Sequence, residues 1–154
     1  MAWIGAHTYV LRGEVESDQR LLWDLFAADR VPLLLGIQYA GRQAGWSVQW
    51  PHAEGYVIEV DSVPVGRLLL NRTEALWWVV DLAVLPHRRG EGIGGQVMAD
   101  LVRQASMIGA RLGLKVEQDS EARRFFESHG LKRVGEDEEQ VILQTSLEPV
   151  VGLI

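Results

Sequence analysis

Apolar residues recur along the chain at two spacings, which predict a mixture of strands and helices. Short apolar runs bounded by turn residues are typical of strands. The predicted strands are residues 8–13, 56–60, 63–70, 76–85, 114–116, 131–134 and 140–145. We expect the second and third to form a hairpin around Asp61-Ser62, and the last two to be joined by the acidic turn 135–139.

Helical spacing of apolar residues predicts four helices. Ser17 is the expected N-cap of the first. The buried stripe of that helix is expected to contain Leu21, Leu22, Leu25 and Phe26. Pro32 fits the first turn of the second helix. The third is expected to end near Leu112, and the fourth to cover 120–128 with Gly130 as a left-handed cap. The order of elements indicates an α/β mixture with hairpins at both ends.

Composition indicates one globular domain covering residues 1–154. The chain is 47% hydrophobic and 23% charged, which favours a folded protein over a disordered one. No apolar run is long enough to span a bilayer, so no membrane association is expected. Residues 1–7 lack the basic start and long apolar centre of a signal peptide. We therefore expect a cytoplasmic protein.

Charge and missing residue types narrow the possible chemistry. The chain has no cysteine, which excludes disulfides, thiol nucleophiles and thiolate metal sites. No pair of histidines has the spacing of metal ligands, so no metal is expected. The net charge of −6 argues against non-specific nucleic-acid binding and suits a small cationic substrate.

A glycine-rich turn follows the predicted strand 76–85, which is interrupted only by Asp81. A helical pattern comes directly after the turn. Strand, glycine turn and helix together direct free backbone N–H groups at an anion, and arginines add positive charge. The predicted phosphate-binding residues are Arg88, Arg89, Gly90, Glu91, Gly92, Ile93, Gly94 and Gly95.

Two common phosphate-binding motifs fit this turn poorly. A P-loop ends in Gly-Lys-Ser/Thr, whereas this chain has Gln96 after its last two glycines. A dinucleotide fingerprint is matched by the glycine spacing, and Glu117 lies about 20 residues further on, where a ribose-binding acid belongs. However, residues 86–89 separate the strand from the first glycine, and only 37 residues follow Glu117. A dinucleotide-binding protein is therefore kept as a minor alternative.

Two motifs in order support a third interpretation. Residues 82–94, with the core Arg89-x-x-Gly92-x-Gly94, resemble the acyl-CoA signature Gln/Arg-x-x-Gly-x-Gly/Ala of the GCN5-related N-acetyltransferases (GNATs). Residues 119–131 are similar to the Asn-x-x-Ala-x-x-Leu-Tyr-x-x-x-Gly-Phe segment of that family, and residues 64–68 and 81–83 resemble a bacterial subgroup of it. The resemblance implies one acyl-CoA N-acyltransferase domain. Its expected fold is a mixed, mostly antiparallel twisted sheet of six to seven strands with splayed central strands and about four helices.

The same resemblance implies acetyl-CoA as cofactor. The amides of the glycine turn would hold the pyrophosphate, and the main chain of Leu82, Ala83 and Val84 would pair with the pantetheine arm. A bulge would splay this strand from 114–116, and an N–H near 82–84 would stabilise the oxyanion. Further cofactor-binding residues implied by the second motif are Asp119, Ala122 and Phe126. The implied reaction is direct acetyl transfer to a primary amine of a small molecule or peptide.

The acid–base groups are less clear from the sequence. Asp81 is either the base or substrate anchor, or an acceptor that fixes the bulge. Glu117 is either a base acting through water or a solvated carboxylate. Phe126 replaces the tyrosine that the family uses as general acid, and Asp119 replaces an asparagine and so lacks the amide donor. Two functions therefore remain open: a working N-acetyltransferase, or a catalytically weak acyl-CoA-binding or sensor module.

The remaining candidates concern the acceptor and the oligomer. Tyr39, Trp46 and Trp50 are expected either to line an acceptor pocket between the second helix and the hairpin, or to pack in the core or its rim. The tail 148–154 is apolar enough that we expect it to dock on its own sheet or on a second subunit. Dimers are common in the resembled family, so a homodimer is one expected assembly.

Overall fold

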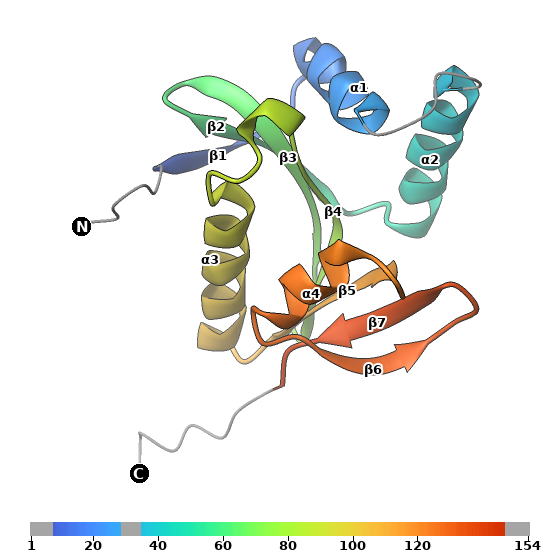
Figure 1. Ribbon diagram of the computed structural model, residues 1–154, viewed down its shortest axis with the longest axis vertical. Coiled ribbons are helices and arrows are strands. Elements are labelled where there is room, and N and C mark those ends of the chain that lie inside the picture. The colour runs from blue at the N-terminus through green and yellow to red at the C-terminus, as the bar shows by residue number, and fades with distance from the viewer. Residues whose placement is uncertain (1–7, 29–34, 147–154) are drawn as a thin grey trace. The chain divides into compact units, whose positions relative to one another are not determined.

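The structure, a computed structural model, describes residues 8–28 and 35–146. The predictions for the N-terminal residues 1–7, for Pro32 and for the tail 148–154 lie outside these ranges. The strands of the described residues are β1 (Tyr9–Gly13), β2 (Glu54–Val60), β3 (Val63–Arg72), β4 (Leu76–Val84), β5 (Arg111–Glu117), β6 (Lys132–Glu136) and β7 (Gln140–Gln144). The helices are α1 (Gln19–Ala27), α2 (Leu35–Gln49), α3 (Ile93–Met107) and α4 (Glu121–Glu127), with short 3₁₀ turns η1 (Glu16–Asp18) and η2 (Pro86–Arg88) (Figure 1).

The strands form one hydrogen-bonded sheet in the order β1-β2-β3-β4-β5-β7-β6. Pairs β1–β2, β2–β3, β5–β7 and β6–β7 are antiparallel, and β4–β5 is parallel. These strands and helices confirm the predicted mixed α/β fold with a mostly antiparallel sheet. The register of β4 with β5 covers three residue pairs and ends at Trp78 opposite Gly113.

The chain divides into two compact units, each built from two segments. The first comprises the described residues up to Asn71 together with Val80–Gly94. The second comprises Arg72–Val79 together with the described residues from Gly95 onward.

In the first unit, β2 and β3 form the predicted hairpin. Asp61 and Ser62 occupy its two-residue loop with φ of 52° and 64°. Two positive φ values are the geometry of a type I′ turn, whose twist matches that of the strands. Residues 65–70 of β3 are all buried, as expected for a strand covered on both faces. Helix α1 contributes its apolar stripe to this core with Leu22, Leu25 and Phe26.

The prediction that Ser17 is the N-cap of α1 is wrong. Ser17 lies within η1, and α1 begins at Gln19. The N-cap residue is Asp18, whose carboxylate makes no cap bond with the helix. It accepts hydrogen bonds from Arg12 at 2.8 and 2.9 Å and from the amide of Val15 at 2.8 Å. The carboxylate therefore ties the 3₁₀ turn to β1, and it is this tie that displaces the helix start.

In the second unit, α3 presents one apolar stripe to the core. Its buried residues in this unit are Val97, Met98, Leu101 and Ala105. The helix ends at Met107, five residues before the predicted end at Leu112. Gly109 has a φ of 74°, and Ala110 and Gly109 donate to the carbonyls of Ala105 and Ser106. This is a Schellman ending, which releases the chain early enough for Leu112 to enter β5.

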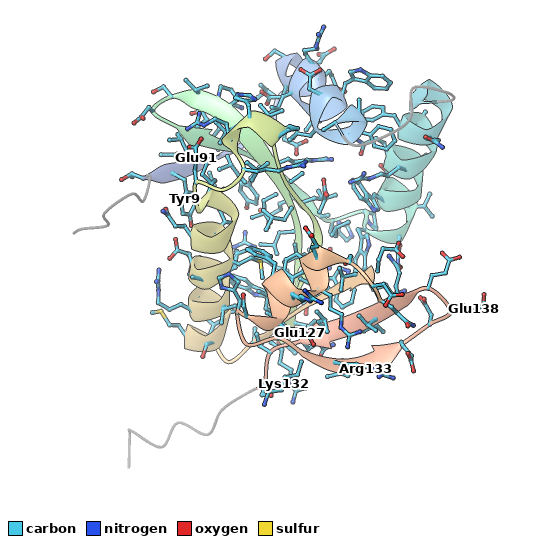
Figure 2. The ribbon with its side chains drawn as sticks, viewed as in Figure 1. Tyr9, Glu91, Glu127, Lys132, Arg133 and Glu138 are labelled. Atoms are coloured by element: carbon cyan, nitrogen blue, oxygen red, sulfur yellow. The ribbon has the colours of Figure 1, made fainter. Side chains whose placement is uncertain are left out.

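The fourth helix follows its prediction closely. Ser120 caps α4 by accepting a hydrogen bond from the amide of Arg123, and Gly130 has a φ of 90°. Beyond it, β6 forms one edge of the sheet. Lys132 and Arg133 are exposed on this strand, and Arg133 pairs with Glu136 (Figure 2). Charged side chains on an edge strand discourage pairing with another chain.

Candidate active site

The glycine turn has the backbone geometry of an anion-binding site. Gly90 and Gly92 have φ of 82° and 84°, values that other residues rarely adopt. A Cβ added at either would meet no atom within 4 Å, so open space faces both glycines. Helix α3 begins directly after them at Ile93. Because the first amides of a helix have no carbonyl partner within it, this turn directs N–H donors and the positive end of the helix dipole outward.

The side chains of both arginines of the turn donate hydrogen bonds within the protein. Nε of Arg88 donates to both carboxylate oxygens of Glu91, at 3.1 and 3.0 Å. This hydrogen bonding raises the pKa of Arg88. Nε of Arg89 donates to the carbonyl oxygen of Val84 at 3.0 Å and so ties the turn to the end of β4. The backbone amides, more than free arginine charge, are therefore what the turn offers an anion.

At the end of β4 the main chain comes unusually close to β3. A Cβ at Gly66 would overlap the carbonyl oxygen of Ala83, so only glycine permits this approach. The amide of Leu85 then donates to the carbonyl of Val65 at 2.8 Å. Thus the carbonyl of Ala83 is directed at β3, while that of Val84 accepts from Arg89. Residues 82–84 are half-buried rather than enclosed in the core.

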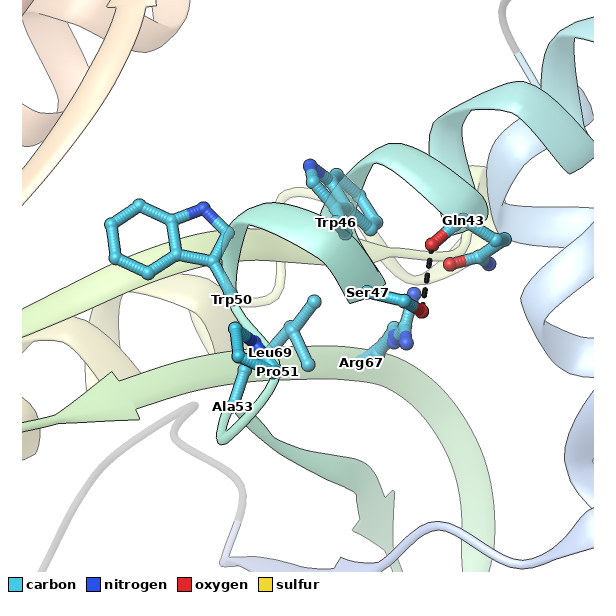
Figure 3. A pocket seen from close by; sticks show the side chains of 8 residues that line it. All are labelled: Gln43, Trp46, Ser47, Trp50, Pro51, Ala53, Arg67 and Leu69. Atoms are coloured by element: carbon cyan, nitrogen blue, oxygen red, sulfur yellow. Dashed lines mark hydrogen bonds between the residues drawn. The ribbon is translucent and has the colours of Figure 1, made fainter.

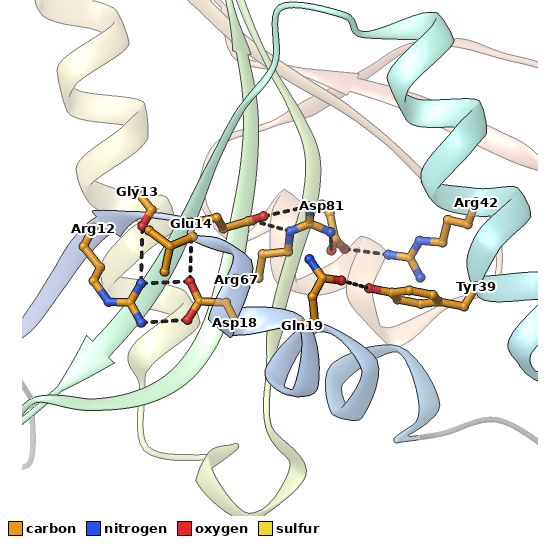
Figure 4. A network of polar contacts seen from close by, with 10 residues as sticks. Arg12, Gly13, Glu14, Asp18, Gln19, Tyr39, Arg42, Arg67 and Asp81 are labelled. Carbon is orange, nitrogen blue, oxygen red and sulfur yellow. Dashed lines mark hydrogen bonds and ion pairs between the residues drawn. The ribbon is translucent and has the colours of Figure 1, made fainter.

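Asp81 lies in a series of alternating charges within the first unit (Figure 4). Its Oδ1 is 3.0 Å from Nη2 of Arg42, and its Oδ2 is 3.9 Å from Nη1 of Arg67. Arg67 also donates to Glu14 through Nε at 2.7 Å and Nη2 at 3.3 Å. The side chains of Asp81 and Arg67 are only 16% and 10% exposed, so each charge needs the partners it has.

The ion pair with Asp81 also connects helix α2 to β4. The guanidinium of Arg42 lies 4.0 Å from the ring centre of Trp46 and 5.4 Å from that of Phe26. The guanidinium of Arg67 lies 5.6 Å from the same Trp46 ring. Cations over aromatic faces are attracted by the ring quadrupole, and the attraction grows as water is excluded. Helix α2 is thus attached through charges and rings.

A pocket of about 220 Å³ opens between α2 and β3 (Figure 3). The residues that line it are Gln43, Trp46, Ser47, Trp50, Pro51, Ala53, Arg67 and Leu69. Arg67 and Leu69 are two apart on β3, and alternate residues of a strand share one face. Two of the three predicted acceptor residues, Trp46 and Trp50, line this pocket.

The third predicted acceptor residue has a different position. The ring of Tyr39 makes edge contacts with Trp23 at 5.4 Å and Phe26 at 5.3 Å between ring centres. Its hydroxyl lies 3.5 Å from Oε1 of Gln19. Tyr39 therefore joins α2 to α1 and is not in the pocket lining.

The second unit holds the other predicted site residues. Glu117 is exposed at the end of β5 and pairs with Gln140 of β7. Asp119 and Ala122 are exposed at the start of α4, and Phe126 is half-buried, with its ring centre 5.1 Å from that of Phe125.

The first turn of α3 within this unit lies near His129. A Cβ added at Gly95 would lie 3.8 Å from Nε2 of that histidine. Burial lowers the pKa of His129, which favours its neutral form.

Sequence analysis missed Arg42, Arg67 and Glu14 as partners of the site. One signal was available, because Arg67 is the single charge in the apolar run 65–70, just as Asp81 is in 76–85. Two lone opposite charges in consecutive strands indicate a buried ion pair. No comparable signal marks Arg42 or Glu14, which lie in polar surroundings in the sequence.

The described residues contain neither a cluster of metal ligands nor a helix that could span a membrane. Within 8–28 and 35–146, no three His, Asp or Glu side chains group as metal ligands would. No helix in those ranges combines the length and hydropathy required to cross a bilayer.

Comparison with known structures gives the same fold. The chain is similar to PaiA N-acetyltransferase from Thermoplasma acidophilum in complex with coenzyme A, with a TM-score of 0.68, 14% identity, and 90% of this chain and 99% of that chain covered. It is similar to the ribosomal-protein-S18-alanine N-acetyltransferase from Escherichia coli, with a TM-score of 0.66, 13% identity, and coverage of 93% and 96%. A GNAT family acetyltransferase from Elizabethkingia anophelis with acetyl-CoA bound gives a TM-score of 0.61, 15% identity, and coverage of 90% and 98%.

Comparison at the sequence level identifies the family. No curated protein matches the chain. A family model described as an acetyltransferase (GNAT) domain matches residues 51–133, more than half of the sequence. The match includes β3, β4, the glycine turn and α3. The chain therefore belongs to the GNAT acetyltransferase family.

Proposed function

We propose that this protein transfers an acetyl group from acetyl-CoA to a primary amine by direct attack of the amine on the thioester. The observation that carries the proposal is the turn of residues 89–94, where two glycines with positive φ precede the first amides of α3. Backbone donors in this arrangement fit a pyrophosphate. Structures similar to this chain contain coenzyme A or acetyl-CoA, which supports the choice of cofactor.

Different segments of the chain bind the cofactor and activate its thioester. The glycine turn binds the pyrophosphate, and the main chain of residues 82–84 aligns the pantetheine arm. Acetyl-CoA supplies the activated acyl group. An amide of residues 82–84 donates to the developing oxyanion, the kind of interaction whose loss costs about 100-fold or more in kcat. Asp119, Ala122 and Phe126, in α4 and its preceding loop, are the further cofactor-binding residues that the resemblance to the family implies.

The role of Asp81 divides into two testable possibilities. Its ion pairs with Arg42 and Arg67 support a positioning role, which holds the acceptor side of β4 in place. A base would instead accept the proton of the attacking amine. In Asp81→Asn, loss of a base removes the acidic limb of the pH profile of kcat/KM, whereas loss of a positioning contact lowers kcat/KM at every pH. Glu117→Gln provides the same comparison for the second candidate base.

The cofactor site is tested by Gly92→Asp, with Gly109→Asp as matched control. Both glycines flank α3 and have positive φ, 84° and 74°, so the backbone strain of the two variants is similar. Only Gly92→Asp places a negative charge where the pyrophosphate would bind. We expect its affinity for CoA by calorimetry to fall about 100-fold or more, because like charges brought together cost several kcal/mol. Equal CoA affinity in the two variants would refute the assigned turn.

A second function, a CoA-binding module without turnover, is favoured by one residue. Phe126 has no hydroxyl where the resembled family has its general acid. Release of CoA thiol with a panel of primary amines separates the two functions. Thiol release that depends on the amine establishes the transferase. Tight acetyl-CoA binding without such release establishes the module.

A further inference from the structure

The pocket between α2 and β3 has a lining of unusual chemistry for a protein of net charge −6. Its walls are mainly the two indoles of Trp46 and Trp50 with the apolar side chains of Pro51, Ala53 and Leu69. Ser47 donates its hydroxyl to the carbonyl of Gln43 in its own helix at 3.0 Å, so that donor is already used. The lining is therefore mixed, with indoles and apolar side chains in one part and the polar side chains of Gln43, Ser47 and Arg67 in the other.

One ionised side chain contributes to the pocket lining. Arg67 is the one ionised residue among the eight that line it, and no carboxylate is among them. Glu14 neutralises Arg67 from outside the lining, through two hydrogen bonds. A second ammonium on the acceptor would therefore meet a guanidinium and no carboxylate in the lining. The pocket disfavours polyamines, although the net charge of the whole chain would attract them.

The aromatic surface of Trp46 does not replace a carboxylate for such a cation. The guanidinium of Arg42 lies 4.0 Å from the ring centre of Trp46, and that of Arg67 lies 5.6 Å away. Its attraction for cations is thus already used by two arginines of the protein. A neutral ring has no such competition, since it stacks on indole edges and faces by dispersion and apolar burial.

The size of the pocket suits one ring system. The pocket has about 220 Å³, whereas an apolar cavity of about 150 Å³ is enough to bind benzene. The volume is therefore enough for one substituted ring. A single methyl group would leave most of the space unfilled.

The pocket is also close to the strand segment where acetyl transfer is proposed to occur. Arg67 lines it and lies 3.9 Å from Asp81, the residue before the strand segment 82–84 that is proposed to align the thioester. An amine on a short linker from a ring in this pocket is therefore directed toward β4.

We propose that this pocket binds a neutral aromatic ring of the acceptor, so that the substrate class is a primary amine carrying one aromatic ring. This inference rests on the proposed acetyltransferase function. The neutral amine nitrogen forms a bond to the thioester carbonyl carbon, and the carbon–sulfur bond breaks. The nitrogen then loses a proton, which balances the departing thiolate as CoA thiol.

The substrate test compares phenethylamine, hexylamine, ethylamine and spermidine with acetyl-CoA, by release of CoA thiol. We expect kcat/KM for phenethylamine to exceed that for each of the others by tenfold or more. Equal values for phenethylamine and hexylamine, or a preference for spermidine, would overturn the assignment of the pocket while leaving the transferase function standing.

Two variants test where the ring binds. Ala53→Phe fills the pocket, and Trp50→Ala removes one wall. We expect each to raise KM for phenethylamine at least tenfold. Val48→Ala is the matched control, because Val48 lies near the end of α2, close in sequence to both positions, and is 83% exposed and outside the lining. An unchanged KM in Ala53→Phe that folds, as judged by circular dichroism, contradicts the proposal.

Ligand binding without turnover separates this inference from the function it rests on. Saturation-transfer NMR with phenethylamine and the full chain detects ring contact in the absence of acetyl-CoA. A signal that Ala53→Phe abolishes supports the pocket even when no amine is acetylated, in which case only the transferase function fails. Absence of both signal and ring-dependent turnover refutes the pocket assignment.

Discussion

Helices α2 and α3 have the same length, 15 residues, and are attached in opposite ways. Helix α3 buries a continuous apolar stripe, including Val97 and Met98 with no exposed surface. In α2, none of the described side chains, residues 38–49, is buried. Tyr39, Arg42 and Trp46 attach it through ring contacts and an ion pair.

The two kinds of attachment have different roles. Apolar burial stabilises the fold, whereas ring contacts and ion pairs set the geometry of the candidate site. An apolar stripe stabilises a helix in proportion to the area it buries and tolerates changes of detail. Charges and rings stabilise less but fix orientation, because their strength depends on distance and angle. Helix α2, which forms one wall of the pocket, uses the second kind of attachment. The following four predictions test this contrast, from the largest expected effect to the smallest.

The apolar attachment is tested by Met98→Ala. Met98 is fully buried, and truncating a buried methionine costs about 2–5 kcal/mol of unfolding free energy. The control is Met107→Ala in the same helix, where the side chain is 78% exposed and the expected change is below about 0.5 kcal/mol. Urea denaturation measures both. Similar losses in the two variants would mean that the stripe does not stabilise α3.

The polar attachment is tested by Arg42→Ala. Hydrogen bonds between charged groups contribute about 1.5–3 kcal/mol, so we expect amide exchange within α2 to speed up roughly tenfold or more, with α3 unaffected. Arg20→Ala is the control, because the Arg20–Asp24 pair is at the surface, with Arg20 86% exposed. Hydrogen exchange followed by mass spectrometry resolves the two helices. Unchanged exchange in α2 would show that the ion pair does not hold it.

Acid should weaken the first unit through Asp18. Hydrogen bonds from Arg12, and then from the amide of Val15, hold the pKa of this carboxyl below its usual value. The native state therefore binds fewer protons than the unfolded state near the usual carboxyl pKa. The stabilisation is complete above about pH 4 and is lost as the pH falls through the native pKa.

The loss is expected to be on the order of 1 kcal/mol, and Asp18→Asn should remove it from the pH dependence of urea stability. Asp137→Asn is a parallel variant, because backbone hydrogen bonds from Gln140 and Glu139 also lower the pKa of Asp137. A pH dependence in Asp18→Asn identical to that of the unaltered chain would exclude the proposed contribution.

The smallest effect is expected at Gly45 of α2. A Cβ there would meet nothing within 4 Å, and alanine favours a helix interior over glycine by about 0.5–1 kcal/mol. Gly45→Ala should slow amide exchange in α2 by about twofold to fivefold. Gly113 of β5 is the crowded counterpart, because a Cβ there would lie 3.0 Å from Gln144 and 3.1 Å from Trp78, and these side chains would have to shift to admit it. Faster exchange in Gly45→Ala would indicate that the helix needs its glycine.

The sequence predicted the strands, the glycine turn and the stripe of α3, because burial imposes a period that apolar residues reveal. It misplaced the ends of helices at Ser17 and Leu112, where single polar contacts and one glycine decide the boundary. It singled out Asp81 as the lone charge of its strand, and Trp46 and Trp50 do line a pocket, but the roles of all three residues stay predictions. The partners Arg42 and Glu14 could not be found, since an ion pair between distant positions leaves no local pattern.

At Gly66, only the hydrogen atom in place of a side chain lies between β3 and the carbonyl of Ala83 in β4. The carbonyl of Ala83 occupies the place where any larger residue would have its first carbon. Arg67 of the pocket follows directly on one strand, and residues 82–84 lie on the other. A methyl group at position 66 would force the strands apart and, in the proposed complex, would lengthen the gap between the amine and the thioester without touching either. Misplacement of reacting groups by about 1 Å can cost about 100-fold in rate, so catalysis would fail there well before folding does.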